Sequence, residues 1–246
     1  RRSSDLLGGD NVNVTSIINS TNVDAHDYEP TTSDIAKLQK AQVIIVNGAG
    51  YDAWAVKAAQ TANAIIVNAA EIGGVNDGEN PHVWFSADVR KAVAQAITEA
   101  YEQADAAKKN DFDKMNDQWA AEENNVESKI AEVKQKTDGL AYAATESVAS
   151  YLAEDMGLAD ATPSGYARAT ANESEPTPTD IKQFTDELKA GEIKLLVVNT
   201  QEESELTGKI TDAAKSVEVP MVELTEQMPE QYDSLTAWME GLVRSE

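Results

Sequence analysis

A long segment near the middle of the chain contains neither glycine nor proline. It restricts the folds that the remainder of the chain can adopt. Between residues 110 and 136 the apolar positions are spaced by three, four or seven residues, as on one face of an α-helix. They are Phe112, Met115, Trp119, Val126, Ile130 and Val133. At 1.5 Å per residue this helix is roughly 40 Å long, which predicts a stiff strut between two lobes. Two shorter helices broken near Asn124 and Asn125 are the alternative.

Short apolar runs alternate with helical patterns on both sides of this segment. The strand candidates are residues 12–18, 43–46, 64–67, 140–145, 195–198 and 219–224. Helices are expected over residues 52–62, 147–156, 207–217 and 232–243. Residues 159–180 contain three prolines and no clear period, which predicts a long loop. Short apolar strands separated by helices favour parallel βαβ units with both faces of the sheet covered.

These patterns predict an α/β fold of two lobes, each with a parallel sheet flanked by helices, joined by one long backbone helix with a cleft between the lobes. The expected divisions are an N-terminal lobe over residues 1–107, the linking helix over 108–136 and a C-terminal lobe over 137–246. The C-terminal part carries 22 acidic and 7 basic residues. Its surface is therefore expected to differ electrostatically from that of the other lobe.

Composition excludes several classes of function. The chain of 246 residues has 43 acidic and 20 basic residues, a net charge of −23 and no basic cluster, which argues against nucleic-acid binding. It has no cysteine, so disulfides, thiolate metal sites and a cysteine nucleophile are excluded. No run of about 18 apolar residues and no secretion signal is visible, so we expect no membrane span within the chain.

Both histidines and two of the carboxylates lie where strands are expected to end. His26 and His82 are in loops after strand candidates of the first half, Glu146 directly follows residues 140–145, and Glu226 directly follows residues 219–225. Ligands of open α/β sheets bind at the carboxyl ends of the strands. Two imidazoles and two carboxylates facing each other across a cleft suit a divalent ion such as Mn²⁺ or Zn²⁺. For any one of them taken singly, a surface role is the alternative.

Five motifs carry a resemblance to a known family. They are Asp24-Ala25-His26-Asp27-Tyr28-Glu29-Pro30-Thr31-Thr32-Ser33-Asp34, Asn47-Gly48-Ala49-Gly50-Tyr51-Asp52, Asn80-Pro81-His82-Val83-Trp84, Ala144-Thr145-Glu146-Ser147, and residues 219–226. In order and spacing they resemble the metal-receptor family of bacterial ABC uptake systems, the solute-binding proteins for manganese and zinc. The likeness extends from about Leu7 to the C-terminus.

The resemblance implies a metal-binding receptor of two lobes whose metal ligands are His26, His82, Glu146 and Glu226. A carboxylate at the third ligand position, Glu146, favours manganese, with zinc next. The implied partner is the permease of an ABC transporter, for which the acidic C-terminal third is a candidate docking surface. The implied location is extracytoplasmic, as an anchored lipoprotein or a periplasmic protein whose signal and anchor lie outside this chain, and the protein is expected to be a monomer.

The chain departs from the family pattern in two places. Ala25 stands where the family usually has proline, next to the first predicted ligand. Family members also begin with a strand and a helix ahead of residues 10–18, for which residues 1–7 are too short. The N-terminal lobe is therefore expected to lack the family's first strand.

Two other functions are compatible with parts of the pattern. A metal-dependent hydrolase could use the same residues, but it needs an open coordination position and a general base, and the chain has no His-Glu-x-x-His motif and no third histidine. A surface protein for cell adhesion, without a small ligand, leaves four ligand-like residues unexplained. The sequence therefore predicts metal capture and delivery, and no enzyme.

Overall fold

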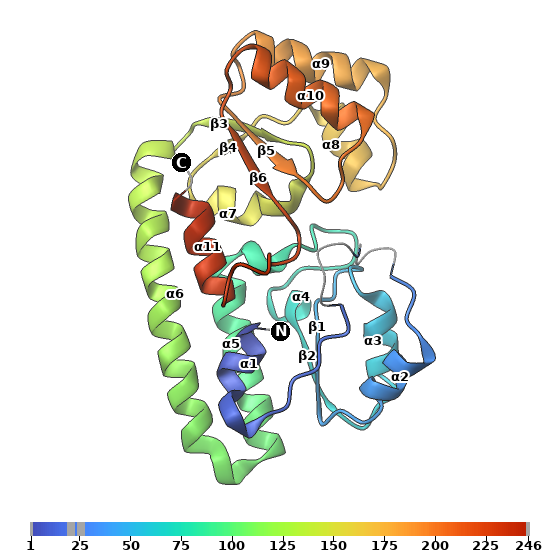
Figure 1. Cartoon of the computed structure of the whole chain (residues 1–246), viewed down its shortest axis with the longest axis vertical. Coiled ribbons are helices and arrows are strands. Elements are labelled where there is room, and N and C mark those ends of the chain that lie inside the picture. Colours follow the sequence, from blue (N-terminus) through green and yellow to red (C-terminus); the bar gives the residue numbers. More distant parts are fainter. Residues whose placement is uncertain (1, 19–22, 24–27, 245–246) are drawn as a thin grey trace.

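The computed structural model describes residues 2–18, 23 and 28–244, and it consists of two lobes connected along one side by a long helix (Figure 1). The first lobe is built around strands β1 (Val43–Val46) and β2 (Ile65–Asn68), and the second around strands β3 to β6. Helix α6 (Lys109–Thr137) runs beside both lobes without a break. The prediction of one long helix is confirmed, and the alternative of two shorter helices is wrong.

In the first lobe, β1 and β2 pair in parallel, with Val43 opposite Ile65 and Val46 opposite Asn68. Ile44 and Val46 pack against α3 (Ala53–Ala59), and α2 (Thr32–Leu38) lies beside that helix. Val67 belongs to a second core with α5 (Ala87–Ala104), α6 and α1 (Arg2–Gly8). Helix α4 (Ala69–Ile72) directly follows β2.

Residues 12–18 form no strand, contrary to the sequence prediction. Alternation of apolar and polar residues shows which side chains suit burial, whereas a strand also needs an adjacent edge to pair with. Val12 is instead partly buried against the core that contains Leu7 and Tyr101. The short 3-10 helix η1 (Gly9–Asn11) connects α1 to this extended stretch.

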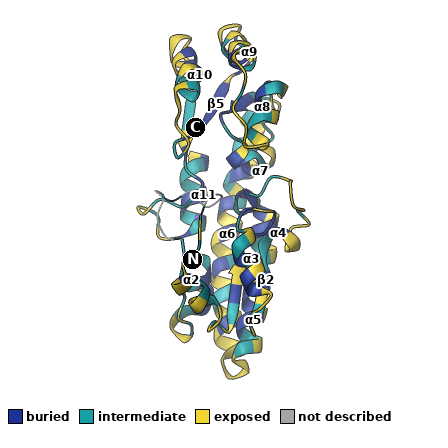
Figure 2. Cartoon of the chain, turned by 90° about the vertical axis from the view of Figure 1, so that its right-hand side faces the viewer, coloured by how far each residue is buried: buried dark blue, intermediate teal, exposed yellow. Residues whose placement is uncertain are grey.

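The second lobe contains a four-stranded parallel sheet in the order β4-β3-β5-β6. Its strands are β3 (Ala141–Ala144), β4 (Ala159–Asp160), β5 (Leu195–Asn199) and β6 (Met221–Leu224). One face packs on α6, α7 (Ser150–Asp155) and α11 (Leu235–Arg244), and the other on α8 (Ser164–Ala171), α9 (Pro178–Lys189) and α10 (Glu205–Ser216). The central strand β5 is buried along its whole length (Figure 2).

The long loop predicted over residues 159–180 is wrong, because this stretch contains β4, α8 and the start of α9. Two of the prolines that suggested a loop mark helix starts instead. Pro163 is the N-cap of α8, and Pro178 is the first residue of α9, where the hydroxyl of Thr177 accepts a hydrogen bond from the Asp180 backbone N–H. Proline suits a first helical turn because its missing N–H would have no partner there.

One face of α6 contributes to both cores. Phe112 and Trp119 pack in the first lobe, and Val126 and Ile130 pack in the second. Between them, Glu123 is fully buried and its Oε1 accepts hydrogen bonds from Nε and Nη2 of Arg90 at 3.0 and 2.5 Å. Arg90 lies on α5, so this buried ion pair joins the two long helices. Within the described ranges, we find no helix with the length and apolar character of a membrane span.

Candidate metal centre

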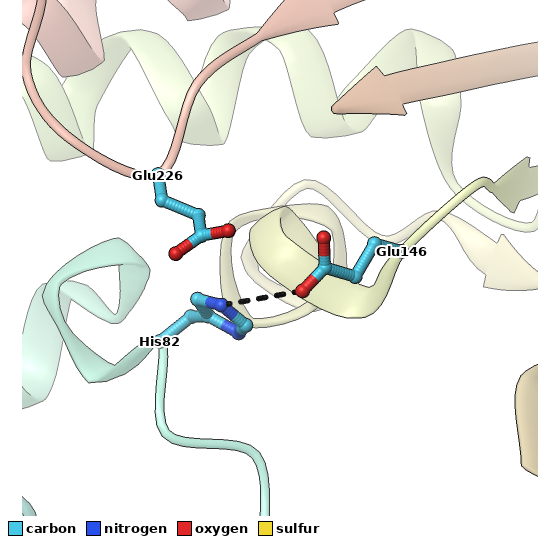
Figure 3. Close-up of side chains that lie close together, drawn as sticks. All are labelled: His82, Glu146 and Glu226. Atoms are coloured by element: carbon cyan, nitrogen blue, oxygen red, sulfur yellow. Dashed lines mark ion pairs between the residues drawn. The ribbon is translucent and has the colours of Figure 1, made fainter. Parts of the chain in front are cut away.

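Three of the four predicted ligands come together between the lobes. Glu146 and Glu226 each follow a strand of the second lobe, β3 and β6, by two residues, so both lie at the carboxyl edge of that sheet. His82 comes from the first lobe, just before the 3-10 helix η2 (Val83–Phe85). The three side chains point toward one another, and one ligand atom of each lies within 4.8 Å of the others (Figure 3).

The imidazole of His82 is held from several sides. Its Nδ1 lies 2.6 Å from Asn80 Oδ1, and its backbone N–H donates to the same oxygen at 3.1 Å. Its Nε2 is 3.8 Å from Glu146 Oε1. The rings of Tyr51 and Trp84 contact it edge-on, with centroids at 6.0 and 5.3 Å. His82 is only 2% exposed, so this packing fixes the direction of the ring.

The two carboxylates share one amide donor. Asn199, the last residue of β5, lies between the strands that lead to Glu146 and Glu226, and its Nδ2 donates to Glu146 Oε2 at 2.5 Å and to Glu226 Oε1 at 3.1 Å. Its Oδ1 accepts the backbone N–H of Gln201 at 3.0 Å, which directs the NH₂ group to the carboxylates. Glu226 Oε2 also accepts a hydrogen bond of 3.0 Å from the hydroxyl of Tyr51, across the gap between the lobes.

The loop of residues 47–52 supports the site from the first lobe. The carboxylate of Asp52 accepts the backbone N–H groups of Asn47 and Gly48, both at 2.8 Å. Burial raises the pKa of the Asp52 carboxyl, and these two hydrogen bonds oppose that rise. The side chain of Asn47 donates to the carbonyl of Pro81 at 2.8 Å. One loop therefore positions both Tyr51 and the residue before His82.

Gly48 is required at its place in this loop. Its φ is +81°, and a Cβ there would lie 2.1 Å from Oδ1 of Asn68. Gly50 has a similar φ of +82°, but a Cβ at that position would meet no atom within 4 Å, so only its backbone conformation favours glycine.

His26, the remaining predicted ligand, lies outside the described residues. Val23, three residues before it, accepts a hydrogen bond of 3.0 Å from Nε2 of Gln227, the neighbour of Glu226. The described part of the chain that leads to His26 therefore contacts the strand-end segment that carries Glu226.

Asn199, Asn80 and Tyr51 were not predicted from the sequence as parts of the site, although Asn80 and Tyr51 lie within motifs that carry the resemblance. One feature of the sequence could have pointed to Asn199. It follows the apolar run of residues 195–198, just as Glu146 and Glu226 follow predicted strands. The resulting donor set is imidazole nitrogen and carboxylate oxygen, both suited to a divalent transition metal.

Comparison with known proteins identifies the family of the chain. Residues 5–245 match the model of the family described as zinc-uptake complex component A, periplasmic. FimA of Streptococcus parasanguinis, a metal ABC transporter substrate-binding lipoprotein, is 24% identical over 212 residues, which cover 79% of this chain and 67% of that protein. The high-affinity zinc uptake system protein ZnuA of Bacillus subtilis is 22% identical over 197 residues, covering 72% and 60%. MtsA of Streptococcus pyogenes, an iron ABC transporter substrate-binding lipoprotein, is 26% identical over 206 residues, covering 74% and 63%.

Solved structures share the fold. A crystal structure of ZnuA superposes with a TM-score of 0.79 at 19% identity, over 99% of this chain and 92% of the other. The laminin-binding adhesin of Streptococcus agalactiae gives a TM-score of 0.81 at 18% identity, over 99% and 93%. The alignments span 60% to 67% of the length of the three relatives named above. The family match over residues 5–245 confirms the resemblance in the sequence: the chain belongs to the zinc-uptake component A family, whose members are substrate-binding components of metal transport and not enzymes.

Proposed function

We propose that this protein is an extracytoplasmic receptor that captures one divalent transition-metal ion between its lobes and delivers it to the permease of an ABC importer. The observation that carries the proposal is the convergence of His82, Glu146 and Glu226, whose ligand atoms lie within 4.8 Å of one another. The relatives named as substrate-binding lipoproteins of ABC transporters support the permease partner and the extracytoplasmic location.

The proposed ligands are these three side chains together with His26. The proposal of His26 rests on the sequence alone. Two donors to these carboxylates, the amide of Asn199 and the hydroxyl of Tyr51, are neutral. These two donors orient the carboxylates and add no positive charge of their own. Loss of hydration water to four protein donors gives a closed coordination shell, as expected for transport and unlike the open shell of a hydrolase.

Manganese is the proposed cargo, with zinc as the next candidate. Two carboxylates and imidazole form a hard to borderline donor set, which suits Mn²⁺. Zn²⁺ binds the same kinds of donor more tightly in the Irving–Williams order, so purified protein is expected to bind Zn²⁺ with higher affinity whatever the cellular cargo. The relatives named for zinc and for iron support a divalent transition metal as the class of substrate.

Elemental analysis of protein purified without chelator, followed by calorimetric titration of the metal-stripped protein, tests this proposal. His82→Ala and Glu226→Gln should each reduce Mn²⁺ and Zn²⁺ affinity by at least about 100-fold, because each removes a ligand. Glu192→Gln is the matched control, since Glu192 is exposed and lies between α9 and β5. An affinity for Glu226→Gln equal to that of Glu192→Gln would contradict the proposed site.

A further inference from the structure

Asn80 bonds to both lobes at once. Its Oδ1 accepts the backbone N–H of His82 at 3.1 Å and lies 2.6 Å from the imidazole Nδ1. Its Nδ2 donates to the backbone carbonyl of Ser147 at 2.7 Å, and its own carbonyl accepts the hydroxyl of Tyr151 at 2.7 Å. Ser147 directly follows Glu146, and Tyr151 lies on α7, so both contacts are with the second lobe.

These contacts fix the orientation of the amide. A backbone carbonyl accepts hydrogen bonds only, so the group that faces Ser147 must be the NH₂ of Asn80. The group that faces His82 is then the amide oxygen, as its bond from the His82 backbone N–H also requires. An amide oxygen cannot donate, so Nδ1 of the neutral imidazole must carry the proton, and Nε2 carries the lone pair.

The ring atom with the lone pair faces the other proposed ligands. Nε2 of His82 is 3.8 Å from Oε1 of Glu146, too long for a hydrogen bond and suited to two donors that share one ion. The second tautomer would place a proton on Nε2 and prevent coordination by that atom. Outer partners that fix a tautomer typically change metal affinity by 10- to 100-fold.

We propose that Asn80 is a positioning residue with two roles: it holds His82 in the Nδ1-protonated tautomer, and it ties the His82 loop to the backbone beside Glu146. Ligands from the two lobes are thereby assembled before an ion arrives, which lowers the ordering cost of binding. The role in metal binding rests on the function proposed above.

Matched variants distinguish the two roles of Asn80. Asn80→Asp keeps an oxygen that accepts from Nδ1 and loses the donor to Ser147, whereas Asn80→Ala loses both. Tyr151→Phe removes the other hydrogen bond of Asn80 to the second lobe and leaves the Asn80 side chain intact. Asn124→Asp, at an exposed position of α6, controls for the asparagine-to-aspartate exchange itself.

Imidazole ¹⁵N NMR of the metal-free protein at pH 8 tests the first role, because the chain has only two histidines and His26→Asn assigns them. His82 should be protonated on Nδ1 in the wild type, Asn80→Asp and Tyr151→Phe, and should shift toward the Nε2-protonated form in Asn80→Ala. Nε2 protonation in the wild type, or an unchanged tautomer in Asn80→Ala, would overturn the assignment.

Release of bound Mn²⁺ or Zn²⁺ to a chelator, followed by stopped flow, tests the second role. Asn80→Asp and Tyr151→Phe should release the ion about tenfold faster than the wild type and Asn124→Asp, while Asn80→Ala should lose about 10- to 100-fold in affinity. Wild-type release rates in both cross-lobe variants would overturn the second role. A wild-type protein that binds no metal overturns the proposed function and with it the role of Asn80 in binding. Metal binding with His82 in the other tautomer overturns the role of Asn80 alone.

Discussion

Replacing Asn199 by aspartate should destabilise the metal-free protein strongly and in a pH-dependent way. The exchange keeps the shape of the side chain and turns its NH₂ group into an oxygen. Asn199 is 2% exposed, and its NH₂ group donates to Glu146 at 2.5 Å and to Glu226 at 3.1 Å. Two stabilising contacts therefore become contacts between carboxylate oxygens.

The size of the effect follows from these distances. Two unit charges 3 Å apart repel by about 5.5 kcal/mol at an effective dielectric constant of 20. Protonating the new aspartate instead requires about 4 kcal/mol at pH 7, from an ordinary pKa of about 3.9 and 1.36 kcal/mol per pH unit. Protonation costs less than the repulsion, so the folded variant should protonate its aspartate. The free energy of unfolding should therefore fall by about 4 kcal/mol at pH 7. At pH 5 the same calculation gives about 1.5 kcal/mol, because the folded variant then binds its extra proton more easily.

Urea unfolding of chelator-stripped protein at both pH values measures this effect, with Asn124→Asp as the control at an exposed site. The wild type and the control should differ little, since surface substitutions usually change stability by less than about 0.5 kcal/mol. If Asn199→Asp unfolds like the control at pH 7, or if its deficit does not shrink at pH 5, then Asn199 does not separate the two carboxylates as described.

Three further predictions concern the scaffold around the site. Arg90→Met should lower the free energy of unfolding by about 3–5 kcal/mol in urea, because it leaves the buried Glu123 carboxylate without its cation, and adding Glu123→Met should recover most of the loss. The N-cap threonine hydroxyl and backbone N–H hold the pKa of Asp34 well below its usual range, so its contribution is present above about pH 4 and is lost as the pH falls further. Asp34→Asn should make acid unfolding, followed by circular dichroism, less steep than in the wild type. Gly48→Ala should lower the free energy of unfolding by about 1–3 kcal/mol through backbone strain and a clash, and should weaken Mn²⁺ binding. Gly50→Ala, with open space around the new Cβ, should leave the Mn²⁺ affinity near that of the wild type. Equal affinities in the two variants would contradict the importance of that loop.

The elements that could be predicted well from the sequence are those whose local pattern is compatible with only one type of secondary structure. The continuous apolar runs at residues 43–46 and 195–198 became parallel strands, the first buried at Ile44 and Val46 and the second along its whole length, and the long amphipathic segment became α6. Residues 12–18 and 159–180 were misjudged because their structure depends on something that the local pattern lacks. The first needs a neighbouring strand edge, and in the second prolines that start helices were read as marks of a loop.

The same distinction applies to the site. His82, Glu146 and Glu226 could be proposed because imidazoles and carboxylates at strand ends have a recognisable chemistry. Asn80 and Asn199 could not, because asparagine is common in loops and its role here depends on partners 67 and 53 residues away along the chain. The part played by His26 stays a prediction from the sequence.

The shared face of α6 limits what the space between the lobes can enclose. Trp119 is fixed in one core and Val126 in the other, and a continuous helix sets their axial separation at about 10 Å. The two lobes are therefore held at a nearly constant separation along this side, because moving them far apart would require α6 to bend. Two-lobed receptors that enclose larger ligands close by wide hinge motion. Enclosing a sugar or a peptide between these lobes would require α6 to bend, whereas the single ion proposed as the cargo requires no such change.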